Sequence, residues 1–276
     1  MLNRNRRYAL VLLRLAVAAL FLAPLLWAMG AALRPAGVPL AAPFLSVTPT
    51  LDSFARLFRV LPVGRFTLNS LRVVVLAVPL TLITASWAGY AMARLPRPSQ
   101  RRWVLVSLLV LMVPAIALWP ARFLVYSRLG LTDSIGALIA PAFMGSSPFF
   151  VLMFYRAFRR IPPAIYDAAR IDGAGVLETW RRVALPIARP TAFAVAILTF
   201  IFYWGDFLSP LLYLSDARDY TLPVGLELLE QLGRTDYSLL MAGALWATLL
   251  PVVLIVVIVS TMALKERQNP QKEQNS

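Results

Sequence analysis

The chain has 276 residues, of which 59% are hydrophobic and 14% are charged, a composition that excludes intrinsic disorder and argues against a soluble globule. It contains no Cys and no His, which excludes disulfides, thiol or imidazole catalysis and zinc sites made from those residues. The net charge of +14 would suggest nucleic-acid binding in a soluble protein, but in a membrane protein it reflects basic cytoplasmic loops, so we expect no nucleic-acid partner.

Six apolar blocks are long enough to cross a bilayer, whose core of about 30 Å needs roughly 20 helical residues. In chain order they are residues 8–33, 67–93, 103–121, 134–155, 190–213 and 239–264. Their length excludes membrane β-strands, which are about 10 residues long and alternate in polarity. The first block is too long for the apolar part of a signal peptide, so we expect a retained span. The sequence therefore predicts an all-α membrane protein with a six-span domain at residues 8–264.

Basic residues set the expected orientation. With the N-terminus inside, the cytoplasmic segments are residues 1–7, 94–102, 156–189 and 265–276, and they hold 17 of the 27 Lys and Arg, against 8 on the opposite side. This bias predicts that both the N-terminal segment 1–7 and the C-terminal tail 265–276 are cytoplasmic. Five proline residues that lie within the blocks predict kinks, because each removes a backbone donor: Pro24, Pro79, Pro114, Pro141 and Pro251.

The longest cytoplasmic segment, residues 156–189, predicts two short helices. Pro162-Pro163 can open a first helix that continues to Ile171, and Asp172-Gly173-Ala174-Gly175 is a turn signal. A second helix is expected from Val176 to about Ala184, with Glu178 placed to meet Arg181 and Arg182, and Leu185-Pro186 is expected to end it. On these residues alone the segment fits equally an interfacial helix pair or a docking site for another protein.

The spacing of this segment is similar to that of the membrane subunits of binding-protein-dependent ABC importers. Their pattern is Glu-Ala-Ala, three residues, Gly, nine residues, Ile, one residue, Leu-Pro. This chain has Asp167-Ala168-Ala169, then Gly173, Val183 and Leu185-Pro186, with Asp in place of Glu and Val in place of Ile. Asp172-Gly173-Ala174 extends the motif as in carbohydrate-type permeases, and two later stretches also resemble theirs: Trp204-Gly205-Asp206-Phe207 and Thr221-Leu222-Pro223-Val224-Gly225-Leu226.

The resemblance implies the type I permease fold of the ABC importers, with six spans as in the shorter maltose- and glycerol-phosphate-type permease. It also implies a multi-pass protein of a bacterial or archaeal cytoplasmic membrane that forms half of a sugar path. The expected partners are a second, homologous permease, a cytoplasmic ATPase dimer, an external solute-binding protein and membrane lipid. The chain has no Gly-x-x-x-x-Gly-Lys-Ser/Thr loop, so we expect no enzymatic activity and no cofactor here; ATP and Mg²⁺ would be bound by the ATPase.

In this family the cytoplasmic loop is a coupling helix that docks on the ATPase. The resemblance therefore assigns the docking role to a set of loop residues: Asp167, Ala168, Ala169, Asp172, Gly173, Leu185 and Pro186. We expect Asp167 to make the charged contact, the two alanines to form the packing face and Gly173 to allow the turn, where a Cβ would be costly if φ is positive.

Asp206 is the one acid within a predicted span. A charged acid inside a membrane costs free energy, and such acids are usually functional. Asp206 therefore either lines the path or lies in water at the end of the span. Hydroxyl and aromatic groups nearby suit sugar rings, and the candidate pathway residues are therefore Ser146, Ser147, Tyr203, Trp204 and Asp206. At helical spacing such residues also serve in packing, and Ser146 and Ser147 fit a small-residue helix contact as well.

Three other classes compete with the leading interpretation. A secondary transporter usually shows an internal repeat and several buried charges, and neither is evident. An intramembrane enzyme without His or Cys would need an aspartate dyad, which one intramembrane Asp cannot form. An ABC permease for a non-sugar solute remains an alternative. The Thr-Leu-Pro-Val-Gly-Leu stretch argues against it, because that stretch resembles those of carbohydrate-type permeases.

Overall fold

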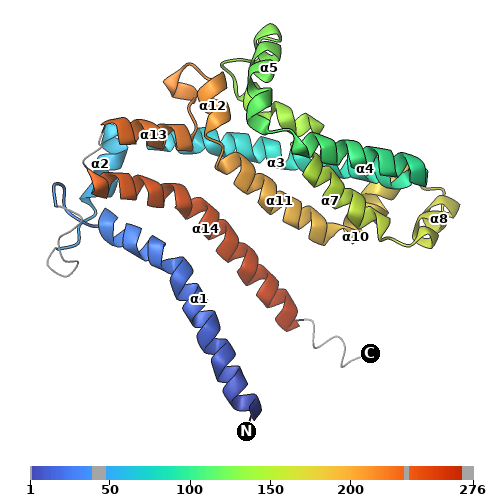
Figure 1. The fold of residues 1–276 in the computed structure, drawn as a ribbon, viewed down its shortest axis with the longest axis horizontal. Coiled ribbons are helices and arrows are strands. Elements are labelled where there is room, and N and C mark those ends of the chain that lie inside the picture. The colour runs from blue at the N-terminus through green and yellow to red at the C-terminus, as the bar shows by residue number, and fades with distance from the viewer. Residues whose placement is uncertain (1, 39–47, 233–235, 269–276) are drawn as a thin grey trace. The chain divides into compact units, whose positions relative to one another are not determined.

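The computed structural model describes residues 2–38, 48–232 and 236–268, and within these ranges every regular element is a helix. The helices form two compact units (Figure 1). One unit combines Met1–Gly64 with Gly225–Ser276, and the other is Arg65–Val224. The described part of the chain is thus all-α, as the sequence predicts.

The first unit is built from the two ends of the chain. It contains α1 (Leu2–Ala32), α2 (Asp52–Val60), most of α13 (Leu222–Leu232) and α14 (Tyr237–Gln268). α14 packs against both α1 and α2 (Figure 1). Apolar side chains cover the outside of α1, where Leu20 is 71% exposed and Phe21 is 74% exposed. A helix with such a surface needs a lipid or protein environment to cover it.

An ionic contact fastens α2 to the start of α14 within this unit. The Arg56 guanidinium donates to Asp236 and also lies 3.0 Å from Asp52, one turn earlier in α2. Asp236 accepts a further bond from the Leu239 amide at 3.1 Å. Burial raises the pKa of Asp236, but the hydrogen bonds from Arg56, Ser238 and Leu239 outweigh it, so the pKa lies below its ordinary value.

The second unit holds the remaining helices. The long helix α3 (Val63–Arg94) and the pair α4 (Arg97–Met112) and α7 (Pro148–Arg159) form its body, and α4 runs beside α7 (Figure 1). α11 (Arg189–Trp204) also packs on α7. The shorter elements of the unit include α5 (Ala115–Arg128), α6 (Ile135–Ile139), η2 (Ala140–Met144), α8 (Pro163–Ile171), α12 (Leu208–Tyr213) and η4 (Ala217–Asp219).

Four of the predicted spans correspond to helices long and apolar enough to cross a membrane. These are Tyr8–Ala32, Val63–Arg94, Ile135–Arg159 and Tyr237–Val257. Two further candidates are bent pairs, Arg97–Met112 with Ala115–Arg128 at 93° and Val176–Ile187 with Arg189–Trp204 at 83°. The described part of the chain therefore offers four spans, or up to six if each bent pair counts as one.

The block at residues 103–121 is bent at Pro114, where the sequence predicts a kink, and the block at residues 190–213 is interrupted between α11 and α12, which the sequence does not predict. α4 ends at Met112 because Pro114 offers no amide and holds the residue before it in an extended conformation. The chain then turns sharply into α5. α11 ends at Trp204, and a short break at residues 205–207 separates it from α12.

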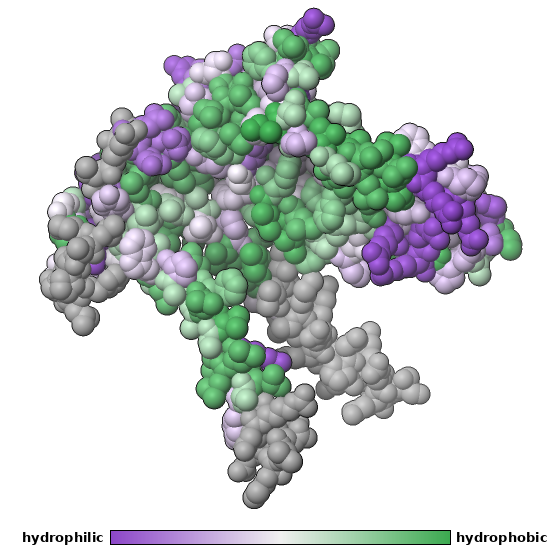
Figure 2. All heavy atoms as spheres, in the orientation of Figure 1, coloured by the Kyte–Doolittle hydropathy of each residue, from purple (hydrophilic) through white to green (hydrophobic). Residues whose placement is uncertain are grey.

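An aromatic core joins α3, α7 and the loop that follows α7. Its buried members include Tyr90, Phe154, Phe158, Tyr166 and Trp180. Gly89 of α3 lies directly against α7, which lets the two helices approach closely. Hydrophilic side chains gather at the end of this unit that carries α8, next to the hydrophobic surface over α4 (Figure 2).

Candidate functional site

The segment predicted to dock on an ATPase folds as two short helical stretches. α8 begins at Pro163, whose missing amide costs nothing in the first turn of a helix. The second stretch runs through α9 (Val176–Glu178), the π-helical turn η3 (Thr179–Ala184) and α10 (Leu185–Ile187). Arg182 lies 2.8 Å from Glu178, at the spacing that the sequence predicts.

Leu185-Pro186 does not end the second stretch, contrary to the prediction, since α10 carries it on to Ile187. The reason lies in the π turn before it. The Leu185 amide donates to the Trp180 carbonyl, five residues back, so the turn is wider than an α-helical one. This width accommodates the Pro186 ring, which would clash with the carbonyl four residues earlier in a regular α-helix.

The turn after α8 depends on Gly173. Its φ is +81°, so the residue adopts the left-handed conformation. This is the positive φ for which the sequence predicts that glycine is needed. The Gly173 amide donates to the Arg170 carbonyl at 3.1 Å, and the Ala174 amide donates to the Ala169 carbonyl at 2.9 Å. These two bonds form a Schellman motif, which closes a helix with glycine in the left-handed position. A Cβ at position 173 would meet nothing within 4 Å, so glycine serves the backbone conformation and not a close contact.

α8 has two distinct faces. Asp167 and Ala168 lie on the exposed face together with Ile171, which is 86% exposed. Tyr166 and Ala169 face the aromatic core and are 5% and 8% exposed. Of the two alanines of the motif, only Ala168 therefore offers its side chain to the outside.

The remaining loop residues lie around these faces. Asp172 is the exposed C-terminal cap of α8. Leu185 and Pro186 are half-buried and line a groove of about 390 Å³ with Leu82 of α3 and Arg189 of α11. Two apolar side chains of the second stretch, Val176 and Leu177, are 68% and 62% exposed. The tip of the loop thus presents apolar and acidic groups side by side.

A second site lies where α7, α11 and α12 begin or end. Ser146 has a φ of +57°, directly after Gly145 at +76°, so two consecutive residues adopt the left-handed conformation. This conformation is uncommon for serine and is held here by neighbours. The Ser146 hydroxyl bonds both the Thr81 hydroxyl of α3 and, at 2.8 Å, the Tyr203 hydroxyl of α11. One chain of hydroxyl groups therefore joins α3 and α11 to the break between η2 and α7.

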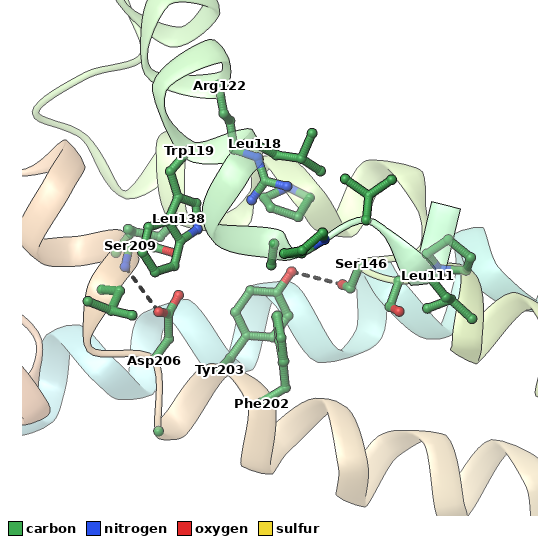
Figure 3. A pocket seen from close by; sticks show the side chains of 18 of the residues that line it. Leu111, Leu118, Trp119, Arg122, Leu138, Ser146, Phe202, Tyr203, Asp206 and Ser209 are labelled. Carbon is green, nitrogen blue, oxygen red and sulfur yellow. Dashed lines mark hydrogen bonds between the residues drawn. The ribbon is translucent and has the colours of Figure 1, made fainter. Parts of the chain in front are cut away.

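Two of these hydroxyl residues, Ser146 and Tyr203, border a cavity of about 720 Å³ (Figure 3). Ser146, Ser147, Tyr203 and Asp206 line it, four of the five residues that the sequence suggests for the pathway. Asp206 accepts a hydrogen bond from the Ser209 amide at 3.1 Å and so caps the start of α12. The Ser147 hydroxyl accepts a bond from the Phe149 amide and caps α7 in the same way.

Trp204, the fifth candidate, is not among the lining residues. Its ring is 8% exposed and stacks on Phe200 at a centroid distance of 5.8 Å. Other aromatic residues do border the cavity, among them Trp119 of α5 and Phe202 of α11. A cation also faces it, since Figure 3 shows the Arg122 side chain extending from α5 on the side where Asp206 and Tyr203 lie.

Sequence reasoning missed Trp119, Arg122 and Thr81 as candidate site residues. The prediction assigned Trp119 to a span and Arg122 to a loop. Pro114 was the signal that could have found both, because a break there redirects α5. Thr81 carries no such signal, since a threonine within a span is common and only the fold brings it to Ser146.

Residues 81–267 match the family described as binding-protein-dependent transport system inner membrane component. Among the curated relatives is the diacetylchitobiose uptake system permease protein NgcG of Streptomyces coelicolor, 30% identical over 258 residues, which are 92% of this chain and 85% of the relative. The trehalose transport system permease protein SugB of Mycobacterium tuberculosis is 30% identical over 74% of this chain and 75% of its own.

An archaeal relative is similar over nearly the full length. The trehalose/maltose transport system permease protein MalG of Thermococcus litoralis is 26% identical, with 92% of both chains covered. Among solved structures, a chain of a bacterial ABC transporter involved in the import of the acidic polysaccharide alginate matches with a TM-score of 0.73 and 19% identity. That match covers 94% of this chain and 96% of the other, and it shows that the two chains share a fold.

Proposed function

Because the chain belongs to the family of binding-protein-dependent transport system inner membrane components, as a carbohydrate-type permease, we propose that it forms half of the translocation path of an ATP-driven sugar importer. The loop of α8 to α10 docks on a cytoplasmic ATPase, and the cavity between α5, α7 and α11 belongs to the sugar path. The observation that carries this proposal is the two-faced α8, which holds Tyr166 in the core and turns Asp167, Ala168 and Ile171 outward.

The exposed face of the loop supports docking through a small contact area. Ile171, Val176 and Leu177 are all more than half exposed, which is costly in water unless a partner covers them. Asp167 lies beside Ile171 and adds one charge that can pair with a basic group of the ATPase. Ala168 has no side chain beyond Cβ, so a partner can approach the α8 backbone closely there.

Replacing Ile171 tests the docking surface. We expect Ile171→Asp to abolish co-purification of an ATPase with the tagged chain in mild detergent. Leu129→Asp is the matched control, because Leu129 is also an exposed apolar residue, 65% exposed, at the far end of α5. Co-purification that survives in Ile171→Asp, or that is lost equally in Leu129→Asp, would contradict docking through this face.

We further propose that both termini and the loop of α8 to α10 are cytoplasmic, in a bacterial or archaeal cytoplasmic membrane. The clustering of Arg residues on the cytoplasmic side of the predicted spans supports this orientation. The sequence has no Cys, so single-cysteine variants give unambiguous labelling. In intact cells a membrane-impermeant maleimide should label Ala217→Cys, and it should label Asp172→Cys only after the membrane is opened. The reverse pattern would invert the orientation.

The proposed assembly contains a second, homologous permease, an ATPase dimer that binds ATP and Mg²⁺, and an external solute-binding protein. An alginate transporter with the same fold has been solved in complex with a pentasaccharide-bound periplasmic protein, which supports the last of these. The names of the relatives, which are permeases for diacetylchitobiose and for trehalose, support an oligosaccharide as the substrate. Purification of the tagged chain from native membranes, followed by identification of the bound proteins, tests the whole assembly.

The cavity supports the role of this chain in the sugar path. Its lining combines hydroxyl groups of Ser146 and Tyr203, the carboxylate of Asp206, the guanidinium of Arg122 and the ring of Trp119. Aromatic faces with a few convergent polar groups are typical of small-molecule sites, and a volume of about 720 Å³ is within their range. An acid and a base in one membrane cavity are seldom retained without a function.

A further inference from the structure

The buried face of α8 fixes the loop to the body of the chain through one side chain. Tyr166 is 5% exposed, and its hydroxyl donates to the Phe158 carbonyl at the end of α7, at 3.2 Å. Burial raises the pKa of Tyr166 to about 12, so the hydroxyl keeps its proton at any physiological pH. α8 is thereby tied to α7 by a bond that does not depend on pH.

The Tyr166 ring also contacts α3. The guanidinium carbon of Arg94 lies 4.5 Å from the centre of the Tyr166 ring, in a cation–π contact. The Tyr90 ring lies 6.2 Å from that of Tyr166 and packs edge-on against Phe158 at 5.7 Å. Tyr166 therefore lies in an aromatic pocket made by the last turns of α3 and α7.

The second helical stretch of the loop reaches the same part of α3. Trp87, one turn before Tyr90, packs edge-on against Trp180 of the π turn, with ring centres 5.1 Å apart. Trp180 is 8% exposed. Both halves of the loop are thus fixed to one stretch of α3, residues 87–94.

This stretch of α3 leads to the cavity. Thr81, which bonds the Ser146 hydroxyl, lies nine residues before Tyr90 on the same helix, a rise of roughly 13 Å. Pro79 lies before Thr81, so no proline interrupts the helix between the cavity and the loop. Gly89 lies in this stretch and is pressed against Val151 and Phe154 of α7, which keeps the two helices in register.

We infer that Tyr166 is the positioning residue that makes α8 and α3 move as one body, so that displacement of the loop reaches the hydroxyl cluster of Thr81, Ser146 and Tyr203. This inference rests on the proposed function, because it takes the loop as the point where the ATPase acts. Closely packed aromatic contacts transmit displacement because they have few alternative arrangements. A loop held only by its flexible ends would move without the helix.

A reporter in the cavity tests the inference in the purified complex. Ser147→Cys lines the cavity and would be the only thiol in this chain. Its labelling rate by a maleimide is measured with and without Mg-ATP and orthovanadate. We expect the parent complex to show a change in rate of about five-fold or more, which is the scale of ordinary coupling between sites.

Variants of Tyr166 separate positioning from folding. Tyr166→Leu should abolish the rate change while the ATPase still co-purifies and hydrolyses ATP at the parent rate. Tyr166→Phe keeps the ring between Arg94 and Tyr90 and should retain most of the change. Ile165→Leu, at the neighbouring exposed position of α8, is the control and should behave like the parent. A full rate change in Tyr166→Leu would overturn the inference.

A cross-link provides a second test that does not depend on the stability of Tyr166→Leu. In Arg94→Cys/Tyr166→Cys, a bifunctional thiol reagent ties α8 to α3. We expect ATP hydrolysis stimulated by the binding protein to be lost in this double variant and to return after cross-linking, because the link replaces the contact that the Tyr166 ring makes. Stimulation that stays absent after cross-linking would overturn rigid coupling. Absence of any ATPase from the wild-type complex would instead overturn the proposed function, and the inference with it.

Discussion

Gly89 of α3 and Phe154 of α7 are so close that no side chain fits between them. A Cβ added to Gly89 would lie 2.7 Å from the Cβ of Phe154 and 2.7 Å from the Tyr155 amide nitrogen. Real Cβ atoms do not approach other atoms so closely, and backbone atoms cannot give way as the end of a flexible side chain can. The crossing of α3 and α7 therefore depends on glycine at this position.

Gly89→Ala should destabilise the protein by about 1–3 kcal/mol, the usual cost of adding a methyl group to a packed interior. Thermal unfolding of the purified complex in detergent measures the effect. Gly64→Ala is the control, since a Cβ at Gly64 on the same helix meets nothing within 4 Å and alanine favours the helix. Equal stability of the two variants would mean that the helices separate easily at this crossing.

Replacing Gly173 should act through the backbone alone. Gly173→Ala places a Cβ on a residue with φ of +81°, at a cost of roughly 1–2 kcal/mol, whereas asparagine tolerates that conformation better. We expect Gly173→Ala to open the loop to limited proteolysis faster than Gly173→Asn does. If both variants are cleaved at the rate of the parent, the left-handed turn is not required in solution.

The contact between Arg56 and Asp236 should make stability depend on acidic pH. Because the folded-state pKa of Asp236 lies below its unfolded value, the stabilisation is fully present above about pH 4 and is lost as the pH falls through the folded pKa. Both side chains are partly exposed, so the contribution is about 1 kcal/mol. Asp236→Asn should lower the melting temperature at pH 7, and the difference from the parent should disappear as the pH falls through the folded-state pKa of Asp236.

The cavity residues should affect transport more than folding. Asp206→Asn keeps an oxygen that caps α12 but removes the charge from the cavity, so uptake should fall while the complex still assembles. Tyr203→Phe removes the bond to Ser146, worth about 1 kcal/mol, and should also lower uptake. Phe143→Leu is the control, because Phe143 is 64% exposed and does not line the cavity. The measurement is the uptake of a labelled oligosaccharide in whole cells, with the level of the complex determined in parallel.

Much of the fold follows from local patterns in the sequence. The apolar blocks predict where the long helices lie, since a run of about 20 apolar residues has few alternatives to a membrane helix. The start of α8 at Pro163 and its end at Gly173 follow from the chemistry of proline and glycine. The kink at Pro114 is predictable, but its angle of 93° is not, because packing beyond the proline decides how far the chain turns.

The cavity depends on contacts that local patterns do not contain. Ser146 and Tyr203 were candidates on residue type alone, yet their bond at 2.8 Å joins segments 57 residues apart. Trp204 was an equally good candidate, and its direction on α11 turns it toward Phe200 instead. Successive residues of a helix point in directions about 100° apart. An error of one position in the predicted helix orientation therefore replaces a residue that lines the cavity with one that packs against its neighbours.

The π turn of Thr179–Ala184 makes the length of the loop part of its geometry. A π turn holds one residue more than the α-helical turn that would otherwise occupy the same space. Removal of a single residue there would narrow the turn to an α-helical one, and the Pro186 ring would then clash with the carbonyl four residues earlier. Removal of one residue from α8 would rotate every later side chain of that helix by about 100°. A deletion should therefore disrupt the loop on either side of Gly173.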